Sequence, residues 1–97
     1  MTFDQFTASL AQPQPPGQLQ PILQGLWYDA KNDWEAAHTI AQSREGTPPY
    51  DRFHAYLHRK EGDRFNANYW YKRAGEPFFQ GSLEEEWKVL VNRLLAN

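Results

Sequence analysis

The chain has 97 residues, no cysteine and a formal net charge of −2. This length supports one domain with a modest core, and the lack of cysteine excludes disulfide bonds and thiolate chemistry. No apolar run is long enough to span a bilayer, and the N-terminal residues lack the basic and apolar regions of a signal peptide. We therefore expect a single cytoplasmic domain over residues 1–97 that does not interact with membranes.

Apolar residues recur with a helical period, and no segment alternates long enough to be a strand, which predicts an all-α fold of about five helices. The first predicted helix covers residues 1–11. A Pro-rich connector, which cannot be helical, follows at residues 12–17. Residues 18–76 are predicted to form two stacked antiparallel helical hairpins. An amphipathic helix is expected over residues 82–96.

Capping residues mark the ends of several predicted helices. Ser82 and Glu85 have the spacing of a capping box. Gly62 suits the left-handed position that ends a helix, and Asp63 can cap the next helix at once. The acidic run Glu84–Glu86 is interpreted as a first turn that complements the helix dipole. The predicted core residues are Leu26, Trp27, Ala37, Ala41, Leu57, Ala67, Trp70, Tyr71, Leu90 and Leu94.

The segment HAYLHRKEGDRFNANYWYKRA, residues 54–74, concentrates the side chains that do chemistry. His54, His58 and Glu61 share one face of a predicted helix, and His38 lies one hairpin upstream. Residues 51–76 hold six basic and four acidic side chains, so this is the only basic part of an acidic chain. We expect a polar ligand-binding site made by His38, His54, His58, Arg59, Glu61, Tyr69 and Arg73.

Three interpretations of the histidines stay open. His54 and His58 can present two imidazoles to one divalent metal such as zinc, and His38 or Glu61 can complete the site. A second interpretation is a pocket for a small polar or anionic ligand, in which Arg59 or Arg73 pairs with the anion. In the third, the imidazoles only form hydrogen bonds within a mixed polar core.

The leading hypothesis for function is a small helical binding module for a small polar or anionic ligand or a partner protein. The alternative is an enzyme, either metal-dependent or using His and Glu as acid and base, and the sequence leaves open whether any reaction is catalysed. No Gly-rich phosphate loop or nucleophile elbow occurs. The acidic chain does not favour nucleic acid, and the sequence is compatible with an oligomer.

Two resemblances support the helical fold. NDWEAAHTIAQ at 32–42 aligns with GDRFNANYWYK at 62–72, so residues 18–76 resemble two tetratricopeptide-like hairpins. The repeat of 30 residues is shorter than the family's usual period of about 34. His54 and His58 stand where that family places large packing residues. Through WEAAH, HAYLHRKEGDRFNANYWYKRAG and EEEW, most of the chain also resembles a small, uncharacterised family of helical microbial proteins, which implies no particular activity.

Overall fold

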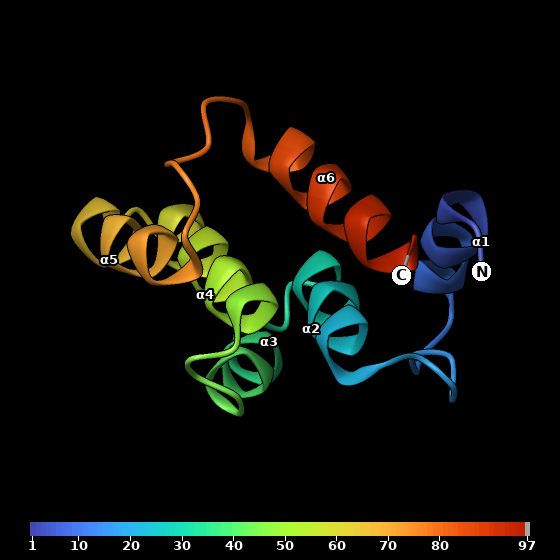
Figure 1. The fold of residues 1–97 in the computed structure, drawn as a ribbon. Helices are drawn as coiled ribbons and strands as arrows, with labels where there is room; N and C mark the ends of the chain where they lie inside the picture. Colours follow the sequence, from blue (N-terminus) through green and yellow to red (C-terminus); the bar gives the residue numbers. More distant parts are fainter. Residues whose placement is uncertain (97) are drawn as a thin grey trace.

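Six α-helices and one short 3₁₀ turn make up the computed structural model, which describes residues 1–96. In chain order they are α1 (Phe3–Ala8), the turn Ser9–Ala11, α2 (Pro21–Ala30), α3 (Trp34–Gln42), α4 (Pro48–Lys60), α5 (Arg64–Ala74) and α6 (Leu83–Leu95) (Figure 1). The all-α prediction is confirmed, with one more α-helix than expected and no strand in the described range. Asn97, which the predicted domain includes, lies outside the described residues. No helix within residues 1–96 is both long and apolar enough to cross a membrane.

Helices α2 and α3 form one antiparallel hairpin, and α4 and α5 form the second, as predicted. Asp33 caps α3 by accepting a hydrogen bond from the Ala36 N–H at 3.1 Å. Asp63 caps α5 in the same way, with the Asn66 N–H at 3.1 Å. Gly62 makes the turn between α4 and α5 with a φ of +85°, a conformation that favours glycine. Because α3 also packs against α4, the two hairpins stack side by side.

The segments outside the hairpins pack across them. Helix α6 begins with the predicted capping box, in which Ser82 and Glu85 each accept a hydrogen bond from the other's backbone N–H at 3.0 Å. It packs against α2 and α4 (Figure 1). Helix α1 packs against α6 through Phe3 and Phe6, whose rings lie 6.1 and 5.9 Å from that of Trp87. The N-terminal helix is therefore fixed to the body despite its Pro-rich connector.

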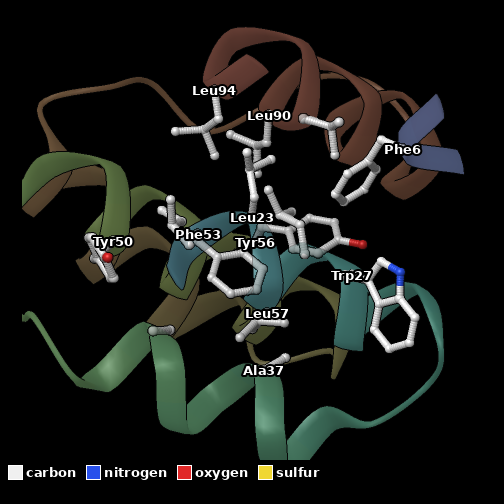
Figure 2. Packing of buried hydrophobic residues seen from close by; sticks show 14 residues of the cluster. Phe6, Leu23, Trp27, Ala37, Tyr50, Phe53, Tyr56, Leu57, Leu90 and Leu94 are labelled. Carbon is white, nitrogen blue, oxygen red and sulfur yellow. The ribbon is translucent and has the colours of Figure 1, made fainter. Parts of the chain in front are cut away.

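The main core lies where α2, α3, α4 and α6 meet, and α1 closes one end of it. Figure 2 shows Leu90 and Leu94 of α6 pointing toward Leu23 and Phe53. A smaller cluster between α4 and α5 contains Ala55, Ala67, Trp70 and Tyr71. All ten residues predicted as core are buried. The helical stripes read from the sequence therefore identify the faces that pack.

Helix α4 is unusual because polar side chains are buried on it together with apolar ones. Arg52 is 3% exposed and contacts Glu86 of α6, which is fully buried. The Arg52 Nη1 donates to Glu86 Oε2 at 2.5 Å, and Arg59 Nη1 donates to Oε1 at 2.6 Å. The Tyr71 hydroxyl donates to the same carboxylate. Glu86 is therefore the centre of a buried ion cluster, whereas Glu84 and Glu85 of the same turn lie exposed.

Replacing Glu86 with Gln should lower the free energy of unfolding by about 3 kcal/mol, because it leaves the buried Arg52 charge without its main partner. This loss is at the low end of the roughly 3–5 kcal/mol that breaking a buried ion pair costs, because Glu76 still accepts from Arg52 Nε at 3.1 Å. The matched control is Glu84→Gln, at a side chain that is 78% exposed and should cost less than about 1 kcal/mol. Urea unfolding followed by circular dichroism measures both. An equal loss of unfolding free energy in the two variants would contradict a stabilising role of the ion cluster.

Candidate functional site

The three histidines come together at the contact between the two hairpins. His38 lies on α3, and His54 and His58 lie one turn apart on α4. The ring of His54 is centred 4.8 Å from that of His38 and 4.8 Å from that of His58. The rings of His38 and His58 are 5.6 Å apart, and one nitrogen of each histidine lies within 4.8 Å of the others. We call His38, His54 and His58 the histidine cluster.

Two tryptophans stack on the histidine cluster. Trp34 lies parallel to His38 with ring centroids 4.3 Å apart, and Trp70 stacks on His54 at 4.0 Å. His54 is 2% exposed, whereas His38 is half-buried and His58 retains 14% of its side-chain exposure. The cluster therefore reaches solvent through His38 and His58. Trp34 was not among the predicted site residues, although it precedes His38 by four positions on α3 and thus lies on the same face.

His54 is held as a neutral ring. Its Nε2 lies 3.0 Å from Nε2 of His38, so one of the two nitrogens carries the shared hydrogen. Its Nδ1 is buried and has no hydrogen-bond partner among the described residues. Burial, and then the proximity of His58 and His38, lower the pKa of His54 to about 4. Burial and His58 also lower the pKa of His38.

Glu61 fixes the orientation of His58. Its Oε1 lies 2.6 Å from Nδ1 of His58. When the imidazole is neutral, Nδ1 therefore carries the hydrogen and donates it, and Nε2 keeps a free lone pair. A carboxylate that accepts from the other ring nitrogen is a common partner of metal-binding histidine. Glu61 therefore contacts His58, and among the described residues it forms no hydrogen bond with His38 or His54.

The remaining predicted residues lie outside the histidine cluster. Arg59 donates to Glu86 and to the Gly81 carbonyl, so it belongs to the ion cluster beside α6. Arg73 lies over Trp70, with its guanidinium 5.1 Å from the ring, and donates to the Tyr69 hydroxyl at 3.3 Å. Of the two arginines proposed as anion partners, only Arg73 contacts a residue that stacks on a histidine.

None of the pockets described within residues 1–96 is lined by a histidine or by Glu61. One is lined in part by Asp29 and Tyr56, and another by Arg52 and Leu94. Neither of these pockets is the polar cavity expected among the histidines and Glu61. The imidazoles and the two tryptophans instead pack against one another. The histidine cluster is therefore a group of packed rings, not a cavity, and it meets solvent only at His38 and His58.

A second feature of the same hairpin is the exposed side of α5. Phe65 is 84% exposed and Tyr69 is 49% exposed, which is unusual for aromatic side chains of this size. Three exposed basic residues of α5 form no ion pair with any described residue. We call this surface the α5 outer face; it comprises Arg64, Phe65, Asn68, Tyr69, Lys72 and Arg73.

No family model matches this chain, and no curated protein or solved structure gives a significant match. The resemblances to tetratricopeptide hairpins and to the small microbial family therefore stay predictions.

The free energy of unfolding should fall as the pH is lowered from about 7.5 to about 5. In the unfolded chain His54 takes up a proton with a pKa of 6.5, whereas the folded ring stays neutral until about pH 4. Stability that depends on the neutral ring is therefore complete above the unfolded pKa and is lost as the pH falls toward the folded one. Urea titrations at several pH values measure the effect. His54→Gln should show a weaker pH dependence, and identical slopes in the two proteins would contradict a buried neutral His54.

Proposed function

We propose that this chain is a small helical binding module that recognises an acidic segment of a partner protein through the α5 outer face. The observation that carries the proposal is the exposure of Phe65 and Tyr69 among basic side chains that lack ion-pair partners in the described structure. Exposed apolar patches rimmed by polar groups commonly mark interaction sites. Aromatic residues and arginine also supply much of the binding energy at protein interfaces.

The α5 outer face has two parallel rows, because side chains four positions apart align along a helix. One row is polar and basic, with Arg64 and Lys72 at its ends. The other row is aromatic, with Phe65 and Tyr69, and ends in Arg73. A partner helix with apolar side chains beside carboxylates complements both rows. Its apolar side chains would cover the aromatic rings, and its carboxylates would pair with the basic groups.

The charge of the chain supports an acidic protein partner over nucleic acid. The hairpin region at residues 51–76 has a balance of +2, while the whole chain is at −2. An acidic segment is therefore attracted to this region and repelled by the rest of the surface. A local excess this small does not give the many phosphate contacts that hold a nucleic acid at physiological salt. The partner must be recognised by apolar contact and charge together.

The enzyme alternative has less support from the geometry. A general acid or base must come within hydrogen-bond distance of the reacting proton. His54 is almost completely buried, and none of the pockets described in residues 1–96 is lined by a histidine. His58 is more accessible and keeps Nε2 free, but none of the described pockets would hold a substrate against this ring. Binding therefore fits the hairpin better than catalysis.

A designed peptide tests the proposal. The probe is a fluorescein-labelled amphipathic helix of Leu and Glu, about five turns long, and fluorescence anisotropy measures its dissociation constant. Phe65→Ser with Tyr69→Ser should weaken binding at least tenfold, about 1.4 kcal/mol, because it removes the apolar contact. The control is Val89→Ser on α6, which removes a side chain that is 39% exposed and lies outside the α5 outer face. Its affinity should equal that of the unmodified chain.

Two further probes make the test specific. A peptide with Lys in place of Glu should bind at least tenfold more weakly, and so should a single-stranded oligonucleotide. Equal binding of the two peptides, or tighter binding of the oligonucleotide, would overturn the proposal. Unchanged peptide affinity in the Phe65 and Tyr69 variant would do the same. Circular dichroism confirms that the variant folds, as expected for side chains that lie largely outside the core.

A further inference from the structure

We infer that His38, His54 and His58 form a binding site for one divalent transition-metal ion of the zinc class. This site is separate from the α5 outer face and goes beyond the proposed function. It unites side chains from α3 and α4, so an ion bound there would join the two hairpins.

The separation of the ring nitrogens suits a tetrahedral ion. With Zn–N bonds of about 2.0–2.1 Å, neighbouring nitrogens in a tetrahedral site lie roughly 3.4 Å apart. The two Nε2 atoms of His38 and His54 are 3.0 Å apart. One nitrogen from each of the three histidines lies within 4.8 Å of the others. Small ring rotations, which the partly exposed His38 and His58 can make, therefore bring the three donors to one ion.

The hydrogen-bond pattern leaves donor lone pairs in the cluster. Glu61 accepts from Nδ1 of His58, which leaves Nε2 of that ring available to an ion. The Nε2 atoms of His38 and His54 face each other across one shared hydrogen. An ion takes a lone pair from both. The ring that carries the shared hydrogen on Nε2 must then change tautomer and carry it on Nδ1. Because the hydrogen only moves within that ring, neutral rings release no net proton when the ion binds.

The donor set selects the class of metal. Three imidazoles favour zinc, copper, nickel and cobalt, whereas calcium and magnesium prefer oxygen ligands. A metal ion binds the lone pair of a neutral imidazole, and His54 is buried among uncharged aromatic rings. Trp34 and Trp70 stack on the faces of His38 and His54, which limits tilting of these rings but allows the small in-plane rotations that an ion requires. Three protein ligands leave a fourth tetrahedral position, which water can fill at the solvent-facing margin.

Metal titration of the tag-free protein tests the site. Cobalt(II) is added to metal-free protein, and visible absorption reports tetrahedral coordination; isothermal titration with zinc gives the stoichiometry. We expect one ion per chain, with micromolar or tighter affinity. His58→Gln should weaken binding at least tenfold, and because this side chain is partly exposed the variant should fold. His54→Gln should have the same effect if it folds.

Matched carboxylate variants test the role assigned to Glu61. Glu61→Gln should weaken zinc binding about tenfold, whereas Glu84→Gln, at an exposed site on α6, should leave it unchanged. The Phe65 and Tyr69 variant should bind zinc normally, so failure of this site and failure of the α5 outer face are distinguishable. No zinc binding at 100 µM ion, or equal affinity in His58→Gln and the unmodified chain, would overturn the inference.

Discussion

The rest of the structure depends on the polar side chains that α4 buries. Arg52 and His54 are both almost inaccessible to solvent, and each would cost free energy if it lacked a partner inside the protein. Arg52 obtains its partner from Glu86 on α6. His54 obtains one from His38 on α3 and stacks on Trp70 of α5. The positions of α3, α5 and α6 therefore depend on contacts with buried polar side chains of α4.

The two interactions can coexist because of helix geometry. Residues two positions apart on an α-helix point to nearly opposite sides of it, about 160° apart. Arg52 can therefore face α6 while His54 faces α3 and α5. The ion cluster and the histidine cluster are separated by the width of α4. A change in the histidines can thus alter a ligand site while the ion cluster still holds α6 in place.

Local features of the sequence predicted the helices and the core, because caps and periodicity act over a few residues. Asp63 and Ser82 cap the helices assigned to them, and Trp70 is buried on the expected stripe. The role of Glu86 was missed because it is locally equivalent to the two preceding glutamates. Its spacing of four from Leu90 places it on the apolar stripe of α6, which is the signal that distinguishes it.

The candidate site was predicted in part for similar reasons. The histidines share a face because of their spacing on α4, and the hairpin repeat brings His38 to them. Arg59 follows His58 directly and so points about 100° away, toward the ion cluster. The burial of His54 and the free surface of Phe65 depend on which helices pack against α4 and α5. The spacing of residues along one helix does not determine which other helices pack against it.

The protonation of the three imidazoles is the most direct test that they act as one cluster. Two-bond ¹H–¹⁵N NMR of the metal-free protein, recorded between about pH 5 and pH 8, reports the charge and tautomer of each ring. His54 should stay neutral down to pH 5, and His58 should carry its hydrogen on Nδ1 when it is neutral. Titration of both His54 and His38 near the ordinary histidine pKa of about 6.5 would contradict a coupled, buried cluster.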